Sequence, residues 1–426
     1  MIAMQAVILA AGESTRFWPL SEGRHKSLIK VMGKPLVQWT IEAVKKAGIN
    51  DIIIVQSPNG DIEKALDGKI AVDLNIKYVT QHEPKGMGNA LLCAEPYITK
   101  DFFVLLPYHF EAHKHINDMM AKYKQDKADA VLCGAKTSTP WRYGIMSIDG
   151  DRITGLIEKP VKGSEPSDIK VSGIYLLPKD FFNFYSRVER HNNDYEDALA
   201  LMIKECDVQA IIAERETPTL KYSWDFMLLS DSILRSRIKG KNISPTASID
   251  SNVIIEGDVW IGDGTKIFDG AIIKGPCYIG NNCIIGNHSL VRGSIIEDNC
   301  IIGAHAEVAR CFFQRDVHTH SGYFGDSVFD EGVRIGAGTI TANRRIDRNT
   351  IRSVIKGERI DSNLNSLGAI IGRGSRLGVH VSLMPGVLIG SNVIVGPHTM
   401  VTKNIESNTI FYTKHEIVKK KKKHVR

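Results

Sequence analysis

The stretch AVILAAGESTRFWPL, residues 6–20, decides the fold of the first half of the chain. Its apolar start predicts a buried strand, and the strand runs into a turn of small residues. A turn rich in Gly, Ser and Thr lets backbone N–H groups point at an anion, and Arg16 and Lys26 add positive charge there. Taken alone, the turn also fits an ordinary connection between a strand and a helix.

A wider set of residues in the same order makes the pattern more specific. A Pro-Leu pair ends the stretch, and Lys34-Pro35 follows downstream. The set resembles the signature of sugar-1-phosphate nucleotidylyltransferases, L-A-A-G-x-G-T-R-L-x-P-L-T followed by P-K-x-x-x-P-V-x-x-K-P. Two positions depart from it, because Ser14 replaces the second glycine and His25 replaces the proline before the lysine.

The resemblance implies that a nucleoside triphosphate, UTP or dTTP, and a sugar-1-phosphate meet over this loop. It places Gly12 and Thr15 against the substrate and gives catalytic roles to Arg16 and Lys26. The implied reaction is attack of the sugar phosphate on the α-phosphate of the nucleotide, with release of pyrophosphate. The implied product is a sugar nucleotide of the UDP-GlcNAc or the dTDP- or UDP-glucose type.

Length and composition fit a multidomain globular protein. The chain has 426 residues, 43% hydrophobic and 24% charged, which suggests two or three domains. No apolar stretch reaches the ~18–20 residues that a membrane span needs, and the apolar start lacks the basic region of a signal peptide. The seven cysteines form no C-x-x-C pair, which favours reduced thiols in a cytoplasmic protein.

The net charge of +6 comes from the C-terminal tail alone. Residues 414–426 carry seven basic side chains against one acidic side chain, so the rest of the chain is neutral overall. This distribution removes the support for a nucleic-acid-binding protein. We expect the tail to be disordered and solvated, and a weak contact with anionic surfaces is the alternative.

Strands and helices alternate over residues 1–228, which we expect to form a nucleotidyltransferase-like domain. Apolar runs predict strands at 52–55, 76–79, 102–106 and 130–133, and helical spacing predicts helices at 36–47, 86–94 and 116–127. This order predicts a Rossmann-like, mostly parallel sheet covered on both faces. Ligands of such sheets lie beyond the carboxyl ends of the strands.

Several loops of this half resemble the substrate-binding segments of the same family. The segment QHEPKGMGNA, residues 81–90, is similar to Q-x-x-P-x-G-x-x-x-A, in which Gln81 and Gly86 would contact a pyrimidine base. An amide both donates and accepts, so it suits uracil and thymine equally; a plain helix N-terminus is the alternative. The resemblance also implies that four further residues bind the sugar phosphate: Gly144, Glu158, Lys159 and Gly173.

The expected metal ligands are missing. Two anions must approach each other in this reaction, so the family uses Mg²⁺ held by two aspartates. The first aspartate follows the strand predicted at 102–106, where Tyr108 holds its position. The second precedes a Trp-Asp pair, where Thr219 holds its position ahead of Trp224-Asp225. Nucleotidyl transfer by this chain is therefore doubtful.

A different metal is one alternative at this edge. His109, Glu111, His113 and His115 alternate directly after the predicted strand. If this segment stays extended, all four side chains point to one side. Imidazoles favour Zn²⁺ or Ni²⁺ over Mg²⁺, and a polar surface loop without metal is the other interpretation.

The second half has a six-residue period, which is typical of hexapeptide repeats. Aliphatic or aromatic residues mark the repeat at the following positions: Ile243, Ile249, Ile255, Ile261, Ile267, Ile273, Ile279, Ile285, Val291, Ile296, Ile302, Val308, Phe329, Ile335, Ile371, Leu377, Leu383, Ile389, Val395 and Val401. We expect a parallel β-helix over 243–413, interrupted between 308 and 329, after a linking helix within 229–242. The resemblance to hexapeptide acyltransferases implies a left-handed coil and a homotrimer.

The interruption carries a second set of motifs. HSGYFGD at 320–326 and GAGTITAN at 336–343 resemble segments of the acetyltransferase half of bifunctional N-acetylglucosamine-1-phosphate uridylyltransferases of the archaeal type. The resemblance implies transfer from acetyl-CoA to glucosamine-1-phosphate, with His320 as the base, a role that suits an imidazole. Tyr323 and Asn343 would position the substrates.

This half also departs from the family. Two family lysines are replaced, by Ala309 and Asn349. Arg292 and Arg352 remain to bind a phosphate, so the cationic capacity is reduced but present. Two hypotheses follow: a bifunctional sugar-nucleotide enzyme, or a regulatory or scaffolding paralogue that binds sugar nucleotide without turnover.

Overall fold

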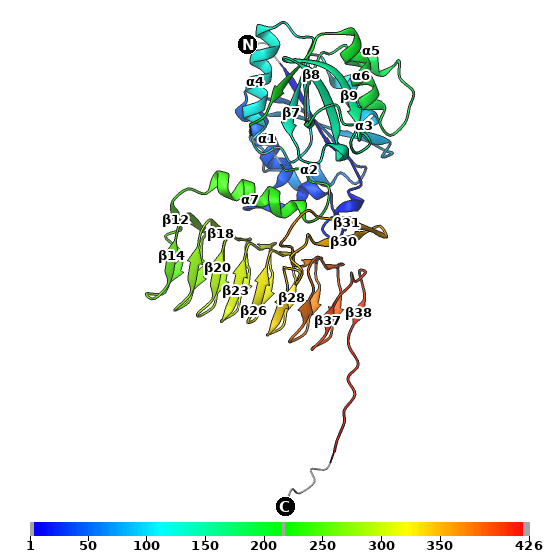
Figure 1. The fold of residues 1–426 in the computed structure, drawn as a ribbon. Coiled ribbons are helices and arrows are strands. Elements are labelled where there is room, and N and C mark those ends of the chain that lie inside the picture. Colours follow the sequence, from blue (N-terminus) through cyan, green and yellow to red (C-terminus); the bar gives the residue numbers. More distant parts are fainter. Residues whose placement is uncertain (1–3, 215–217, 421–426) are drawn as a thin grey trace, which may run out of the picture. The chain divides into compact units, whose positions relative to one another are not determined.

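The computed structural model describes residues 4–214 and 218–420. The chain divides into two compact units, and each is described by itself (Figure 1). Unit 1 comprises Met1–Thr15 and Gly23–Lys221, and unit 2 comprises Arg16–Glu22 and Tyr222–Arg426. A short piece of the N-terminal loop therefore packs with the second half of the chain. No helix within the described residues is long and apolar enough to cross a membrane.

Unit 1 contains a nine-stranded, mostly parallel sheet. Its strands, in spatial order, are β5 (Asn75–Thr80), β4 (Asp51–Gln56), β1 (Gln5–Ala10), β6 (Phe102–Leu105), β10 (Ile169–Leu177), β7 (Ala130–Lys136), β11 (Val208–Ile212), β9 (Arg152–Glu158) and β8 (Gly144–Asp149). β10 runs antiparallel to both of its neighbours, β6 and β7. A separate short ribbon pairs β2 (Lys30–Val31) with β3 (Lys34–Pro35).

Helices cover both faces of this sheet, as the sequence predicts (Figure 1). The helices are α1 (Leu36–Lys46), α2 (Asp61–Leu66), α3 (Gly86–Ala94), α4 (Ala112–Gln125), α5 (Phe181–Tyr185) and α6 (Asp194–Glu205). Along β1, Val7 and Leu9 pack on one side with α3 and α6, while Ala6 and Ile8 pack on the other side with α1 and α4. β1 is buried on both faces, which explains its unbroken apolar run.

Helix ends agree with the sequence signals at two of the three predicted helices. Gly48 follows α1 with φ +85°, a conformation that favours glycine and ends the helix. α3 spans the predicted 86–94. α4 begins at Ala112 rather than at residue 116, so it takes in two histidines that were expected to precede it.

Unit 2 is a parallel β-helix of three sheets (Figure 1). The first sheet contains β12 (Lys241–Ile243), β15 (Val259–Ile261), β18 (Cys277–Ile279), β21 (Ile295–Ile296), β24 (Phe312–Phe313), β27 (Val328–Phe329), β32 (Ile370–Ile371) and β35 (Leu388–Ile389). The second contains β13 (Ser248–Ile249), β16 (Lys266–Ile267), β19 (Ile284–Ile285), β22 (Ile301–Ile302), β25 (His318–Thr319), β28 (Arg334–Ile335), β33 (Arg376–Leu377), β36 (Ile394–Val395) and β38 (Ile410–Phe411). The third contains β14 (Ile254–Glu256), β17 (Ile272–Lys274), β20 (Leu290–Arg292), β23 (Ala306–Ala309), β26 (Gly322–Gly325), β29 (Thr339–Thr341), β34 (Ser382–Leu383) and β37 (Met400–Val401).

The predicted repeat residues form the inside of the coil. They stack from coil to coil, as Ile261 does on Ile279. All of them except Ile243, which is 39% exposed at the first coil, belong to one continuous apolar core. Stacking at the spacing of neighbouring strands, ~4.8 Å, removes these side chains from water without any second layer.

The coil does not break between 308 and 329, so this part of the prediction is wrong. Phe313, Thr319 and Phe324 occupy the inward positions there. The pattern does not reveal them because the steps from Val308 to Phe313 and from Phe324 to Phe329 are five residues and not six. Thr319 is in addition polar. The coil is interrupted later, between β29 and β32, where β30 (Arg352–Ile355) and β31 (Glu358–Asp361) form an antiparallel hairpin.

A helix precedes the coil, and a segment without helix or strand follows it. The linking helix α7 spans Asp225–Arg237 and starts four residues before the predicted range of 229–242. The ring of its Phe226 lies 5.9 Å from the ring of Phe312. Residues 414–420 are exposed and have no helix or strand, and the end of the predicted disordered tail, 421–426, lies outside the described residues.

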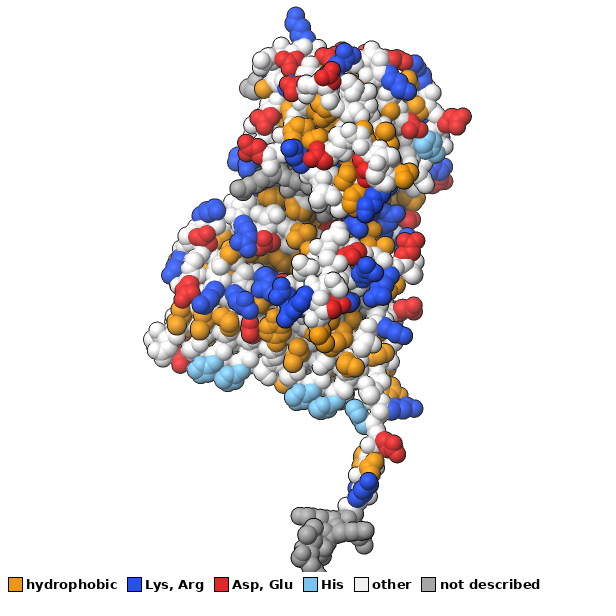
Figure 2. Space-filling model, viewed as in Figure 1, with side chains coloured by type: hydrophobic (Ala, Val, Ile, Leu, Met, Phe, Trp, Pro, Cys, Tyr) orange, Lys and Arg blue, Asp and Glu red, His pale blue; other side chains and the backbone are white. Residues whose placement is uncertain are grey.

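Histidines mark the corners of the coil. Four of them stack in pairs between neighbouring coils, His288 on His305 and His380 on His398. All four have φ between +53° and +58°. Figure 2 shows histidine side chains in a row along one edge of this unit.

Candidate functional site

The first candidate site lies in unit 1 at the loop that follows β1. Ser14, which replaces a family glycine, has φ +56°, and its hydroxyl donates to the carbonyl of Gly12 at 3.2 Å. The serine therefore keeps a left-handed backbone of the kind that glycine adopts freely. No atom lies within 4 Å of a Cβ built on Gly12, so the backbone there is open to a ligand. Thr15 begins the short helix Thr15–Phe17, which includes Arg16.

The second departure from the family pattern also keeps its backbone geometry. His25 has φ −67°, close to the angle that a proline ring imposes. Its Nδ1 accepts a hydrogen bond from the backbone N–H of Ser27, which requires the other ring nitrogen to carry the proton of a neutral imidazole. Burial and the neighbouring Lys26 charge lower the pKa of His25 to about 3.

Lys26 stands next in the chain and points into the same edge of unit 1. Its ammonium group donates to the carbonyl of Leu220 at 2.6 Å. The same nitrogen lies 5.8 Å from the centre of the Tyr108 ring. Leu220 directly follows Thr219, so Lys26 lies next to both positions at which the family carries a metal-binding aspartate.

Tyr108 and His109 follow the C-terminal end of β6, and both are buried. Tyr108 is 6% exposed and His109 is 2% exposed, and their rings stack with centres 5.1 Å apart. Burial and the charge of His115 lower the pKa of His109 to about 3, so the imidazole is neutral. Neither of its ring nitrogens has a hydrogen-bond partner among the described residues. Residues 107–110 are buried, whereas Glu111, His113 and His115 are half-buried, so the polar surface loop that we considered from the sequence is wrong for the start of this segment.

Three of the four residues predicted to bind the sugar phosphate lie close together, and the fourth, Gly173, contacts other residues. A Cβ built on Gly144 would lie 2.9 Å from a carboxylate oxygen of Glu158, and the other oxygen pairs with Lys159 at 2.5 Å. Lys159 has φ +46°, and such strained residues cluster at ligand sites. Gly173, with φ +76°, lies against Leu106 and His109. Only a glycine leaves these approaches open.

Glu196 belongs to the same region and was not predicted. Burial raises its pKa, and the charge of Glu158 raises it further. Burial also raises the pKa of Tyr175, with contributions from the charges of Glu196, Glu158 and Tyr108. These side chains are therefore neighbours although α6, β9 and β6 are far apart in sequence. Clustered groups with perturbed pKa values are typical of functional sites.

Gln81, which the family resemblance predicts to bind the pyrimidine base, makes hydrogen bonds within the protein. It is 4% exposed, and its amide nitrogen donates to the carbonyl of Gly86 at 3.2 Å and to the side chain of Asn89 at 2.8 Å. Both amide hydrogens thus brace the start of α3. The role of Gln81 in base recognition stays a prediction.

The residues at the family's metal positions do not fit Mg²⁺. The phenol of Tyr108 and the hydroxyl of Thr219 replace two carboxylates, and neutral hydroxyls are poor ligands for a hard divalent cation. Within residues 4–214 and 218–420, no group of three or more His, Cys, Asp or Glu side chains could hold a metal ion.

The alternative metal cluster is wrong as well. Glu111 caps α4, and His113 and His115 lie on the helix itself. Positions two apart on a helix point about 200° apart around its axis. His109, buried beneath Gly173, belongs to a different surface. The four side chains therefore share no face.

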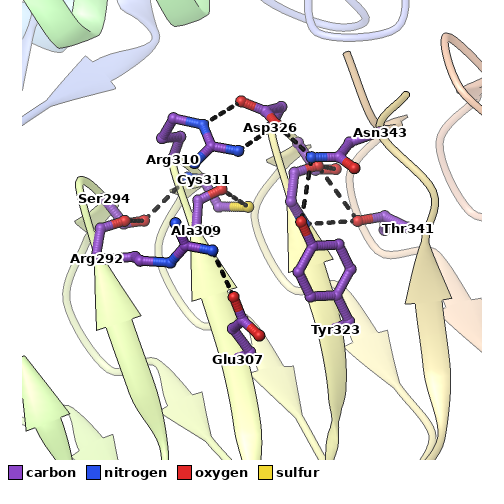
Figure 3. A network of polar contacts seen from close by, with 12 residues as sticks. Arg292, Ser294, Glu307, Ala309, Arg310, Cys311, Tyr323, Asp326, Thr341 and Asn343 are labelled. Atoms are coloured by element: carbon purple, nitrogen blue, oxygen red, sulfur yellow. Dashed lines mark hydrogen bonds and ion pairs between the residues drawn. The ribbon is translucent and has the colours of Figure 1, made fainter. Parts of the chain in front are cut away.

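The second candidate site is a polar network on the β-helix (Figure 3). The Asn343 amide donates to the Tyr323 hydroxyl at 3.2 Å and to Asp326 at 2.5 Å. Arg310 binds both oxygens of Asp326, at 2.6 and 2.7 Å. The Thr341 hydroxyl accepts from the backbone N–H of Gly325 at 2.9 Å. Tyr323 and Asn343, predicted from separate motifs, are thus brought together in three dimensions.

The arginines of unit 2 that could bind a phosphate are partly neutralised by carboxylates. Ala309 replaces a family lysine, and the neighbouring Arg310 supplies a positive charge in its place. The charge of Arg310 is paired with Asp326. Arg292 pairs with Glu307 at 2.6 Å, and both side chains remain more than a third exposed. Arg352 pairs with Asp361 at 3.4 Å in the hairpin and stays 55% exposed. Exposed pairs of this kind are weak, so an incoming phosphate can compete for them.

His320 lies just beyond β25, where the chain turns toward β26. Its backbone N–H donates to the carbonyl of Ile335 at 3.1 Å, and its side chain is exposed. The ring makes no hydrogen bond to the network within the part of the chain that the structure describes. The site offers an exposed imidazole and, three residues on, a tyrosine whose hydroxyl is fixed by Asn343.

Known protein families match both halves of the chain. The nucleotidyl transferase model matches residues 5–225, the GMPPB C-terminal domain model matches 238–329, and the bacterial transferase hexapeptide model, six repeats, matches 368–403. Among solved structures, a UDP-glucose pyrophosphorylase from Acinetobacter baumannii is 23% identical, covers 56% of this chain and 95% of its own, and has a TM-score of 0.49.

Curated relatives match along the whole chain. A bifunctional sugar-1-phosphate nucleotidylyltransferase/acetyltransferase of Sulfurisphaera tokodaii is 33% identical over 96% of this chain and 100% of its own. The bifunctional protein GlmU of Methanocaldococcus jannaschii is 34% identical over 99% of this chain and 100% of its own. The chain therefore belongs to the family of bifunctional sugar-1-phosphate nucleotidylyltransferases/acetyltransferases.

Proposed function

We propose that unit 2 transfers an acetyl group from acetyl-CoA to the amine of a sugar-1-phosphate such as glucosamine-1-phosphate. The observation that carries this proposal is the network in which Asn343 fixes the Tyr323 hydroxyl and Asp326 holds Arg310. A network that is satisfied at every member fixes its side chains in one arrangement, as a site that must position two substrates requires.

The proposed step uses residues that the sequence motifs single out. The amine nitrogen attacks the thioester carbonyl, a C–N bond forms, and the C–S bond breaks to release CoA. His320 accepts the amine proton, because its exposed ring is accessible to a substrate. Tyr323 and Asn343 position the sugar phosphate or the thioester. Arg292 and Arg352 are the cations that bind the phosphate.

We propose that unit 1 binds a nucleoside triphosphate, UTP or dTTP, together with a sugar-1-phosphate. Gly12, Thr15 and Lys26 serve the phosphates, and Glu158, Lys159 and Glu196 serve the sugar. The catalytic role of Arg16, which belongs to unit 2, stays a prediction from the family resemblance. The residues at the metal positions, Tyr108 and Thr219, do not fit Mg²⁺, so the proposal for unit 1 is one of ligand binding. The alternative of a regulatory or scaffolding paralogue has no positive support, since none of the relatives described above is named as a regulatory protein.

The finer properties of the family complete the proposal. We propose a left-handed coil, a homotrimer and a cytoplasmic location, with no nucleic acid as partner. We keep the domain limits predicted from the sequence, 1–228, 229–242, 243–413 and 414–426, as part of this proposal. These points rest on the family resemblance and on the continuous repeat core of unit 2.

The test compares acetyl transfer by two histidine variants. The product, the acetylated sugar phosphate, is followed by mass spectrometry, because the partly exposed thiols of Cys93 and Cys206 would interfere with thiol reagents. His320→Ala should lower the rate by about a hundredfold or more, the usual contribution of a general base. The control is His318→Ala, since His318 lies two residues earlier and pairs with Asp316 at 3.1 Å. Equal rates for His320→Ala and wild type would refute the assignment.

A further inference from the structure

Four exposed histidines of unit 2 form two stacked pairs on neighbouring coils. The ring centres of His288 and His305 lie 5.4 Å apart, and those of His380 and His398 lie 4.9 Å apart. The two rings of each pair are close to parallel, with planes 21° and 24° apart. Within the described residues, none of the four rings makes a hydrogen bond or an ion pair. Each pair therefore presents imidazole nitrogens to the solvent.

The same arrangement occurs twice along one corner of the coil, and Figure 2 shows histidine side chains in two groups along this edge. Strand registers place Gly270 one coil before His288, and Gly338 one coil before His380. In both cases the Nδ1–Cε1 edge of the histidine ring lies against the glycine, where a Cβ would overlap the ring. The order glycine, histidine, histidine on successive coils is thus built at two separate places.

The backbone of this corner does not require histidine. All four histidines have φ between +53° and +58°, and asparagine and glycine adopt such angles as well. At another corner of the coil, Asn282 and Asn299 take these angles on neighbouring coils, with φ +54° and +61°. Gly264 lies against Asn282 as Gly270 does against His288. Histidine therefore supplies nitrogens that the turn itself does not need.

The spacing of each pair suits two ligands of one metal ion. Imidazole is a preferred ligand of Zn²⁺, Ni²⁺ and Cu²⁺. With metal–nitrogen distances of about 2.1 Å, two ligating nitrogens lie about 3.0–3.4 Å apart. The rings must tilt toward each other by about 2 Å at one edge, which exposed side chains achieve by rotation about χ1 and χ2. Water completes the coordination, because no group of three or more metal-binding side chains occurs within the described residues.

We infer that each histidine pair binds one divalent transition metal ion of the Zn²⁺, Ni²⁺ or Cu²⁺ class, and that the ion links two neighbouring coils. The pairs lie on either side of the coil that carries His320. Strand registers place Ser321, the next residue, and Gly338 at the position of the histidines on the two coils between the pairs. The inference does not depend on acetyl transfer, since both pairs lie outside the polar network of Figure 3.

The test measures Ni²⁺ binding to the full chain by equilibrium dialysis, with the bound nickel determined by plasma mass spectrometry. Wild type should bind two ions that the double variant His305→Asn, His398→Asn no longer binds at the same concentration. Each single variant should lose one of the two. Removal of one imidazole should weaken its site by about tenfold or more, because the second ligand no longer holds the ion. Asparagine keeps the backbone conformation of the turn, so the variants should fold.

The matched control is His82→Asn. His82 is exposed in unit 1, and no other aromatic ring stacks on it within the described residues, so its removal should leave the number of bound ions unchanged. Ni²⁺ should also raise the unfolding temperature of unit 2 in wild type and not in the double variant. Equal nickel binding by wild type and the double variant would overturn the inference and would show that the rings only pack on each other. A loss of nickel in His82→Asn as large as in the double variant would overturn it as well.

Discussion

Acidification should destabilise unit 1 through two buried histidines. His25 and His109 are 8% and 2% exposed. Burial, together with the nearby positive charge of Lys26 for His25 and of His115 for His109, lowers the pKa of each to about 3. In the unfolded chain both pKa values return to about 6.5. Between these values the unfolded chain binds protons that the folded chain excludes.

The sign and size of the effect follow from this difference in proton binding. The folded pKa is depressed, so the stability is fully present above about pH 6.5 and falls as the pH drops toward 3. Each histidine costs about 1.4 kcal/mol per pH unit in that window. Between pH 7 and pH 5 the loss is about 1.9 kcal/mol per histidine and about 4 kcal/mol for the two.

Urea unfolding at pH 7 and at pH 5, followed by circular dichroism, measures this loss in the transition of unit 1. His25→Gln and His109→Gln should each lose about 1.9 kcal/mol less than wild type on acidification, because glutamine binds no proton. His191→Gln is the control, since His191 is exposed and pairs with Asp197 at 2.7 Å. A His109→Gln variant with the full wild-type acid loss would refute the reasoning.

Three further predictions concern packing and thiol reactivity. Phe329 is fully buried and stacks on Phe313 at 4.4 Å, so Phe329→Ala should lower the stability of unit 2 by about 3–5 kcal/mol in thermal unfolding. A Cβ on Gly88 would overlap the Asp194 carboxylate and the Tyr185 ring, so Gly88→Ala should cost about 1–3 kcal/mol, whereas Gly155→Ala, whose Cβ would come no closer than 3.5 Å to Ser147, should cost less than about 1 kcal/mol. Burial raises the pKa of Cys283 to about 12 and also raises that of Cys300. Iodoacetamide should therefore modify the partly exposed Cys93 and Cys206 in the native protein but not the β-helix thiols, and intact mass spectrometry measures this.

The sequence predicts most of the fold because both halves are periodic. The repeat from Ile243 to Val401 gives the inside of the coil, and the alternation of strands and helices gives the covered sheet. The prediction fails where the period is kept by other residue types. Phe313 fills an inward position only five residues after Val308, and Thr319 fills the next one with a polar side chain, so the pattern predicts an interruption where the coil is continuous.

The candidate sites are predicted only in part, since tertiary contacts decide the rest. Tyr323 and Asn343 carry family motifs, but the charge partners Arg310 and Asp326 meet only because neighbouring coils stack. Glu196 reaches Glu158 through the packing of α6 against β9. One available signal was overlooked: three acidic residues in the first turn of α6 mark a helix N-terminus, and Glu196 is one of them.

Departures from a motif also need the structure before they can be interpreted. Ser14 and His25 are unusual in the family signature, yet they adopt backbone angles that suit glycine and proline at those positions. Tyr108 and Thr219 are different, because they replace the chemistry of the ligand and not the geometry of the chain. The first pair leaves the loop intact, and the second pair changes what the loop can bind.

The most direct measurement is acetyl transfer by the full wild-type chain from acetyl-CoA to glucosamine-1-phosphate, assayed in excess EDTA. The acetylated sugar phosphate should form at the same rate with EDTA as with MgCl₂, because the network of Tyr323, Asn343, Asp326 and Arg310 contains no metal site. Glucose-1-phosphate, which has no amine, should give no product. Absence of acetylated product in both buffers would contradict the account.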